Sequence, residues 1–343
     1  MCTSYILNGQ VVEFVTGIPE EIKIKSHGNT SSCNPNMLEI NPTVGCQFQC
    51  QYCSSCTQEE KNDFEKVFVF SDYPQYLDSF LADNKDKRDK IYFYFSPKID
   101  CLQACLVESG ITEEILNILH KHCMKYFFLT KGSIPPKSIQ QLLIDSKDLN
   151  QVIASCTMPN ESVRQRLEPY AASIEERMAF AQFCIDSGIF TTAIFSPILP
   201  VDGMNYIERY IDRYLKMGID HFHLDFAELS ALSLAKLTSL VPEYADELNN
   251  VYLAPNVITS QWQIPFKDTE TVRYWPDAHF IQEAFKRFAK YATSIEPRAS
   301  ITACDSLCAR FHFEYLNTNA HKKNLSCMGT RLSTTVVKRK NTQ

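Results

Sequence analysis

Three cysteines stand close together near the beginning of this chain of 343 residues. Cys46, Cys50 and Cys53 form a C-x3-C-x2-C triplet that follows the largely apolar run Met37–Ile40 and a turn containing Gly45. Three thiolates on a tight loop can hold three corners of a cubane iron–sulfur cluster and leave the fourth iron open. An open coordination position is a place for chemistry, as it is in catalytic zinc sites.

Two other interpretations of the triplet stay open. Zinc sites usually pair two C-x2-C units or add a Cys/His pair, and Cys56 is near enough in sequence to join Cys50 and Cys53 in another metal site. The second alternative is a group of structural thiols without a metal. A disulfide scaffold is disfavoured because the chain is long and we expect no signal peptide at its start.

Composition narrows the class of protein. With 45% hydrophobic and 22% charged residues, the chain reads as an ordinary globular protein, and we expect a cytoplasmic location without a membrane span. A net charge of −6 disfavours nucleic acid as a partner. Fourteen cysteines in a reducing compartment indicate metal ligation and thiol chemistry. We find no glycine-rich phosphate loop or dinucleotide fingerprint.

Short apolar runs alternate with helical patterns from residue 38 to about residue 226. Before them, Asn8-Gly9 predicts the turn of a β-hairpin over residues 4–14. Alternation of strands and helices predicts parallel strands joined by right-handed crossovers. The expected strands are Leu38–Ile40, Ile91–Phe95, Tyr126–Leu129, Val152–Ala154, Thr191–Phe195 and His221–Asp225, and the expected helices include Thr112–Cys123, Pro136–Leu143, Ile174–Ser187 and Tyr206–Lys216.

The triplet, with the aromatic Tyr52 directly before its last cysteine, resembles the signature of the radical SAM superfamily. The six strand–helix units resemble the α/β fold of that superfamily, a partial (β/α)6 TIM-like barrel. The resemblance implies a [4Fe-4S] cluster whose open iron binds S-adenosylmethionine (SAM), which is cleaved reductively to a 5′-deoxyadenosyl radical. In such barrels the chemistry lies at the C-terminal ends of the strands, and the triplet follows the first strand.

Residues from about 38 to 200 resemble the spore photoproduct lyase branch of the superfamily. The resemblance implies that Tyr52 packs near the adenine ring and that Lys131 and Ser155 hold polar groups of SAM. Ser96, at the mouth of the expected barrel, is a further candidate for cofactor binding. The fragments that carry the resemblance are Leu129-Thr130-Lys131, Ser155, Arg166-Leu167-Glu168-Pro169, Ser173–Arg177 and Phe195-Ser196-Pro197-Ile198.

The chain departs from this branch at two positions. Pro97 stands where those lyases carry a hydrogen-donating cysteine, and Ser54 replaces the second tyrosine of their radical-relay pair. Cys101 or Cys105 could take over as hydrogen donor, although neither occupies the same place. Repair of a DNA lesion is therefore disfavoured.

A second group of cysteines lies near the C-terminus, beyond the resemblance. Cys304, Cys308 and Cys327 could hold an auxiliary iron–sulfur cluster. A zinc site completed by His312 or His321 is the rival interpretation, and unconnected thiols are the third.

Taken together, these features predict a hairpin and lead-in over residues 1–37, a radical SAM barrel over 38–230 and a cysteine-containing extension over 231–343. The predicted function is a radical SAM enzyme that abstracts hydrogen from a small molecule or a peptide, leading to epimerisation, dehydrogenation, elimination or carbon–carbon bond formation. It needs a low-potential electron donor of the flavodoxin or ferredoxin type. The alternatives are a lesion-repair lyase and a non-enzymatic module stabilised by cysteine-bound metal.

Overall fold

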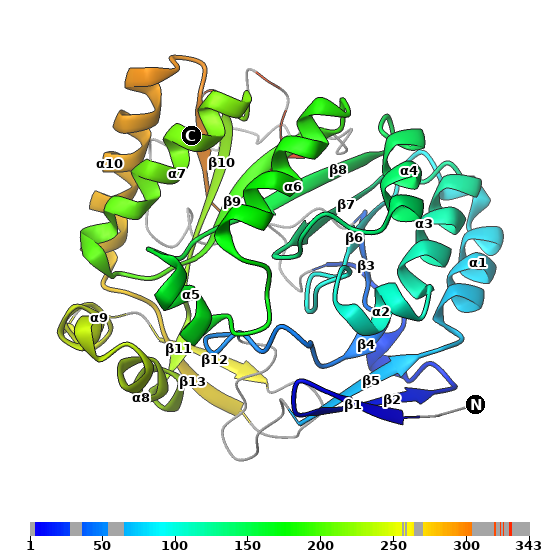
Figure 1. The fold of residues 1–343 in the computed structure, drawn as a ribbon, viewed down its shortest axis with the longest axis horizontal. Coiled ribbons are helices and arrows are strands. Elements are labelled where there is room, and N and C mark those ends of the chain that lie inside the picture. Colours follow the sequence, from blue (N-terminus) through cyan, green and yellow to red (C-terminus); the bar gives the residue numbers. More distant parts are fainter. Residues whose placement is uncertain are drawn as a thin grey trace, which may run out of the picture.

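A curved seven-stranded sheet forms the centre of the molecule, and helices cover its outer side (Figure 1). Two smaller sheets, of four and three strands, lie at one end of it (Figure 1). The computed structural model describes residues 4–27, 36–53, 65–255, 257, 259–263, 270–303, 319, 323, 325, 329 and 330, without the side chains of residues 260–263, 270 and 271.

All neighbours in the large sheet are parallel, in the order β14-β10-β9-β8-β7-β6-β3. Parallel neighbours need long crossover connections, and helices supply them here. The strands are β3 (Met37–Ile40), β6 (Tyr92–Phe95), β7 (Tyr126–Thr130), β8 (Asn150–Ser155), β9 (Phe190–Ile198), β10 (His221–Phe226) and β14 (Ser300–Thr302).

Side chains on these strands alternate between two apolar layers. Phe93 and Phe95 pack with Ile115 of a covering helix in the outer layer. Tyr94, between them, points the other way and stacks on Phe127, with ring centroids 4.5 Å apart. The buried members of this second layer come from strands alone, so they define the inner face of the curved sheet.

Five helices of the outer cover run beside the strands of the large sheet (Figure 1). Among them, the helix after Ser173 begins with a capping box in which Ser173 and Glu176 satisfy each other's backbone N–H groups. The five are α3 (Ile111–Lys121), α4 (Lys137–Asp145), α6 (Ile174–Asp186), α7 (Asn205–Met217) and α10 (Ala278–Ile295).

The N-terminal hairpin of β1 (Ser4–Leu7) and β2 (Gln10–Val15) is part of the four-stranded sheet. Strand β2 pairs in parallel with β5 (Lys66–Phe70), and β5 pairs in antiparallel with β4 (Thr43–Val44). Since β4 directly precedes the cysteine triplet, this sheet supports the loop that carries it.

The remaining elements are a three-stranded sheet and the other helices. The three-stranded sheet consists of β11 (Leu229–Ser230), β13 (Glu270–Tyr274) and β12 (Thr259–Gln263). The other helices are α1 (Tyr73–Asp83), α2 (Ala104–Glu108), α5 (Glu161–Leu167), α8 (Ala231–Leu240) and α9 (Ala245–Tyr252), with short 3-10 turns at Glu20–Ile22, Lys85–Lys87, Asp202–Met204 and Pro242–Tyr244.

The α/β barrel predicted from the sequence is confirmed, because each of the six expected strands is present and the sheet holds them in chain order. The hairpin and the four expected helices are also present. The sequence did not indicate β14, which lies after residue 230 and extends the sheet beside β10. The domain boundaries stay a prediction. Across the described residues, the helices are too short or too polar to cross a membrane.

Candidate active site

The cysteine triplet lies on a loop that turns sharply after β4. Gly45 opens this loop with a φ of 88°, in the left-handed region that favours glycine. A Cβ at this position would lie 2.6 Å from the carbonyl oxygen of Lys66 and 3.3 Å from the Cα of Val67. The glycine therefore lets the loop pass directly against β5 before it reaches Cys46.

The three thiols gather in one small apolar cluster. Cys46 is buried with Phe48 and with Ala171 from the α5–α6 turn, and Cys50 and Cys53 pack against the same group. None of the three forms a disulfide within the described part of the chain. Burial raises the pKa of Cys46, and the nearby Cys50 raises it further. The thiols are thus neighbours that oppose one another's ionisation until a cation neutralises them.

The spacing of these thiols suits a cluster better than a single ion. Within the described residues, no three His, Cys, Asp or Glu side chains lie close enough together to hold one metal ion. One tetrahedral zinc would draw its sulfurs to about 3.8 Å from each other, given Zn–S bonds of about 2.3 Å. A four-iron cluster instead takes each thiolate on a different iron. Cys56, the other thiol considered for a metal site, lies outside the described residues. The three clustered thiols that are described fit three corners of such a cluster.

Buried glutamines fix the start of the loop. The Gln10 side chain of β2 donates from Nε2 to the carbonyl of Cys46 at 3.3 Å. The backbone N–H of Gln47 donates to Oε1 of Gln103 at 2.9 Å, and Nε2 of Gln103 donates to Thr43 at 3.1 Å. The hairpin and the segment after β6 therefore both hold the cysteine loop.

The end of the loop is held by a buried ion pair. Tyr52 donates its hydroxyl to Glu168, and Arg177 donates a charge-assisted hydrogen bond to the other oxygen of the same carboxylate. The side chains of Glu168 and Arg177 are only 0% and 2% exposed. Burial alone would raise the pKa of Glu168, but Arg177 and then Lys131 outweigh it and lower that pKa.

A ring of polar side chains stands at the C-terminal ends of the inner face. Three of them follow an inner apolar residue by two positions, as expected from the alternation along a strand. Lys131 follows Leu129, Ser155 follows Ile153, and Ser196 follows Ile194. Ser96 directly follows the last residue of β6, and Asp225 lies near the end of β10, where the pairing with β9 shifts register. Polar side chains therefore stand at or directly after the C-terminal ends of five neighbouring strands.

Lys131 links the cysteine loop to the far side of this ring. Its Nζ lies 5.9 Å from the ring centroid of Tyr52 and donates to the carbonyl of Ser196 at 3.0 Å. Ser155 donates to the same carbonyl at 3.4 Å. The structure thus brings the three predicted cofactor-binding residues Tyr52, Lys131 and Ser155 together.

The backbone at Lys131 is fixed by Asp100, which the sequence did not single out for this role. The buried carboxylate of Asp100 accepts from the Lys131 N–H at 2.8 Å and from the hydroxyl of Thr130 at 2.9 Å. It also accepts from the N–H of Leu102 at 2.9 Å. Burial still raises the pKa of Asp100, since these donors oppose it only in part.

Ser96 has an unsatisfied hydroxyl. Its side chain is 2% exposed, and its Oγ has no hydrogen-bond partner among the described residues. Thr157, two residues beyond Ser155, also has a buried Oγ1 without a partner in this part of the chain. Buried hydroxyls are usually hydrogen-bonded, so these two, after β6 and β8, are candidates to bind a polar ligand.

Asp225 closes the ring at the end of β10. Its Oδ2 accepts a hydrogen bond of 2.8 Å from the hydroxyl of Ser196. Burial raises the pKa of Asp225 to about 6. The hydrogen bond from Ser196 and the charge of Lys131 lower this pKa, but by less than burial raises it. Asp225 ends a strand expected from the sequence, but the sequence pattern did not indicate which face of the sheet its side chain would occupy.

The candidate hydrogen donors lie elsewhere. Cys101 and Cys105 are both buried in the outer apolar layer, together with helix residues such as Leu106 and Ile115. The structure therefore does not group these thiols with the polar ring. Cys304, Cys308 and Cys327, the candidates for a second metal centre, lie outside the described residues.

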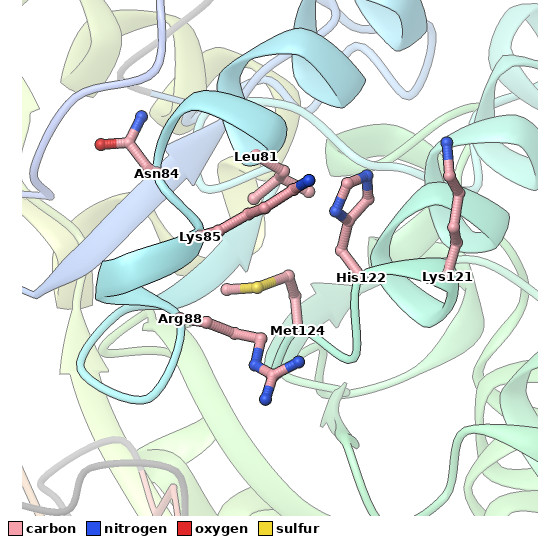
Figure 2. A pocket seen from close by; sticks show the side chains of 7 residues that line it. All are labelled: Leu81, Asn84, Lys85, Arg88, Lys121, His122 and Met124. Atoms are coloured by element: carbon pink, nitrogen blue, oxygen red, sulfur yellow. The ribbon is translucent and has the colours of Figure 1, made fainter.

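A separate cavity of about 200 Å³ lies at the opposite end of the barrel. It opens beside Met124, just before β7 begins, and beside Lys85 and Arg88, before β6 (Figure 2). Lys121 on its rim pairs with Asp78 at 2.9 Å. The C-terminal strand ends carry the polar ring, so this cavity is not part of the candidate site.

No protein-family model matches the chain. The uncharacterized protein MJ0683 of Methanocaldococcus jannaschii is 24% identical over 218 residues, which cover 62% of this chain and 78% of that protein. A mutant of spore photoproduct lyase has a TM-score of 0.60 at 16% identity, over 84% of this chain and 81% of that chain. A second mutant, bound to AdoMet and dinucleoside spore photoproduct, has a TM-score of 0.57 over the same shares at 16% identity. The fold is that of the radical SAM enzymes.

The radical SAM fold agrees with the barrel type expected from the triplet and from the strand pattern. It also agrees with the location of the site, since the polar ring and the cysteine loop both lie at the C-terminal ends of the strands. The sequence missed the partners that hold these groups, namely Glu168 with Arg177, Asp100 and Ser196. Glu168, Arg177 and Ser196 lie within sequence fragments that carry the family resemblance. That resemblance was the signal in the sequence that could have identified them.

Proposed function

We propose that the protein is a radical SAM enzyme. The observation that carries the proposal is the position of Lys131, whose amine reaches from the ring of Tyr52, next to Cys53, to the carbonyl at Ser196. A cation beside three clustered thiols, at the mouth of a radical SAM fold, is suited to an anionic ligand held against a metal cluster. The solved relative with bound AdoMet supports this proposal.

In this proposal Cys46, Cys50 and Cys53 hold a [4Fe-4S] cluster, and SAM binds at its open iron. The Nζ of Lys131 binds the methionyl carboxylate, and the hydroxyls of Ser155 and Ser96 bind other polar groups of SAM. When bound and reduced, the cluster and SAM together supply a 5′-deoxyadenosyl radical that abstracts hydrogen from the substrate.

The chain's own contribution is to position these groups and to exclude water. Tyr52, anchored by Glu168, and the glutamines around Cys46 fix both ends of the cysteine loop. The inner layer below the ring is built around the stacked Tyr94 and Phe127, and its buried aromatic and aliphatic side chains limit the access of water to the ring from that side. Asp100 fixes the strand end that carries Lys131.

A small molecule or a peptide is the proposed substrate. A repair lyase acting on DNA is the alternative, and the chain is poorly suited to it. Pro97 stands where that branch carries its hydrogen-donating cysteine, while Cys101 and Cys105 are packed in the outer layer. The net charge of −6 would also repel a phosphodiester backbone.

Two further components belong to the proposal. A low-potential electron donor of the flavodoxin or ferredoxin type would reduce the cluster, and a reducing compartment such as the cytoplasm would keep the free thiols reduced. Cys304, Cys308 and Cys327 would bind a second metal centre, which is an iron–sulfur cluster or zinc.

Metal analysis after anaerobic reconstitution tests the metal content. The proposal predicts about four iron atoms per chain for one cluster, or about eight if the C-terminal cysteines hold a second one. Replacing Cys304, Cys308 and Cys327 together with Ala distinguishes these cases, because only a second cluster loses about half of the iron. Zinc in place of iron in the wild-type protein would overturn the proposal.

A further inference from the structure

Asp225 is a carboxylate at the barrel mouth whose second oxygen is unused. Phe222, Leu224 and Phe226 pack in the apolar cluster that contains the covering helices, so Asp225 lies on the opposite, inner face of β10. Its Oδ2 accepts from Ser196 at 2.8 Å. Within the described part of the chain, its Oδ1 accepts no hydrogen bond and the carboxylate forms no ion pair.

The other acidic side chains near the opening all have partners. Glu39 lies 2.8 Å from Nδ1 of His27 and 3.3 Å from Nζ of Lys98. Glu168 pairs with Arg177, and Asp100 accepts three hydrogen bonds. An inward carboxylate without a cation is costly to keep, which makes such groups candidates for ligand binding.

The position of Asp225 points to the substrate rather than to SAM. The chain of contacts across the opening runs from Tyr52 to Lys131, then to Ser196, and ends at Asp225. Asp225 therefore lies at the end of this chain away from the cysteine loop. If SAM is bound at the iron and at Lys131, the group that reaches Asp225 belongs to the next molecule outward.

The charges around Asp225 limit which substrate group could bind to it. Among the described residues, Lys131 is the cation that lowers the pKa of Asp225, and its amine already donates to the carbonyl of Ser196. On the inner face, burial and then the carboxylates of Glu39 and Asp225 raise the pKa of Tyr94. This part of the opening therefore repels an anion and stabilises a cation.

We infer that Asp225 binds a protonated amine of the substrate through its free oxygen. This inference rests on the proposed function and narrows its substrate class to small molecules or peptides that carry a cationic nitrogen. A charge-assisted hydrogen bond of this kind is expected to change affinity by about 10- to 100-fold. It would also explain why no ion pair to Asp225 is found among the described residues.

The test uses the reconstituted holoenzyme with SAM and two probes of matched shape and opposite charge. Phenethylamine and 3-phenylpropionate are titrated against the wild-type protein, Asp225→Asn and the control Asp186→Asn, which changes an exposed carboxylate on α6. We expect saturable binding of phenethylamine to the wild type and to the control. Asp225→Asn should weaken that binding at least 10-fold, and 3-phenylpropionate should bind more weakly than the amine.

Three outcomes would overturn the inference. They are the absence of saturable phenethylamine binding to the wild type, equal or tighter binding of 3-phenylpropionate, and retention of amine affinity in Asp225→Asn. A 10-fold loss of SAM affinity in Asp225→Asn would also overturn it and assign the residue to the SAM site. Formation of 5′-deoxyadenosine by the same wild-type preparation reports separately on the proposed function, so the two failures are distinguishable.

Discussion

The guanidinium of Arg177 and the carboxylate of Glu168 form a buried ion pair that also receives the hydroxyl of Tyr52. Arg177 donates from Nε to the carbonyl of Ala172 at 2.8 Å, and the N–H of Ala172 donates to the carbonyl of Lys131 at 3.0 Å. One pair of charges thus joins the cysteine loop to the end of β7.

Breaking this pair should destabilise the chain strongly. Glu168→Gln and Arg177→Met each leave one buried partner without its counterion, so we expect each to lower the free energy of unfolding by about 3–5 kcal/mol. The double variant should lose less than the sum of the two, because it leaves neither charge alone. Chemical denaturation of the apoprotein measures all three. Glu175→Gln, which breaks an exposed pair with Arg213, is the control and should cost less than about 1 kcal/mol. Strict additivity would show that the two charges act independently.

Lys131→Ala should weaken SAM binding without unfolding the protein. The side chain is partly exposed and donates one hydrogen bond to a carbonyl, so we expect its removal to change the free energy of unfolding only slightly. Loss of a charge-assisted contact to the methionyl carboxylate is expected to lower SAM affinity by about 10- to 100-fold. Equilibrium binding of SAM to the reconstituted protein measures this, with the exposed Lys137→Ala as the control. Equal affinities in the two variants would remove Lys131 from the site.

Ser96→Ala separates binding from folding. The hydroxyl of Ser96 has no partner among the described residues, so its removal should leave the stability of the apoprotein unchanged or raise it by up to about 1 kcal/mol. SAM affinity should fall by about 3- to 10-fold if the hydroxyl binds the cofactor. Thermal unfolding and SAM titration give the two readouts, and the exposed Ser133→Ala serves as reference. A destabilised variant with normal SAM affinity would mean that the hydroxyl serves the fold.

Asp225→Asn should stabilise the protein above neutral pH. Burial holds the pKa of Asp225 near 6 in the folded chain, above its usual 3.8. The folded state then binds a proton more tightly than the unfolded state, so stability falls as pH rises from about 4 to about 6 and stays lower above that. Among the described residues, the titratable groups that interact electrostatically with Asp225 are the cation of Lys131, directly after β7, and the phenols of Tyr94 on β6 and Tyr252 on α9, whose pKa values are raised.

The expected gain for Asp225→Asn is on the order of 1–3 kcal/mol at pH 8, and it should vanish near pH 4, where both side chains are neutral. Denaturant unfolding of the apoprotein at the two pH values measures the difference. A variant that is less stable than the wild type at pH 8 would show that the carboxylate has a stabilising partner.

The sequence predicted the barrel well because its strands have strong local signals. Runs such as Ile91–Phe95 and Thr191–Phe195 are apolar on both faces, as strands buried between two layers must be. Strand β14 was missed because Ser300–Thr302 is only three residues long and is stabilised by pairing with β10 rather than by its own pattern. The parallel pairing of the hairpin with β5 was missed for a similar reason, since it depends on segments far apart in sequence.

For the site, spacing identified the groups that can bind a cluster, and resemblance identified Lys131 and Ser155. The sequence could not show what those groups touch. Glu168 and Arg177 are nine residues apart and meet only because α5 ends and α6 begins between them. The unpaired state of Asp225 also depends on the arrangement of neighbouring strands, which the local sequence does not contain.

The most direct test of the account is the formation of 5′-deoxyadenosine from SAM after anaerobic reconstitution and reduction. We predict that the wild-type protein and Cys123→Ala, which changes an exposed thiol, both form it. The triple variant with Ala at Cys46, Cys50 and Cys53 should form none, because it lacks the cluster at which SAM is cleaved. Formation of 5′-deoxyadenosine by the triple variant, or its absence from an iron-loaded wild-type protein, would contradict the central claim.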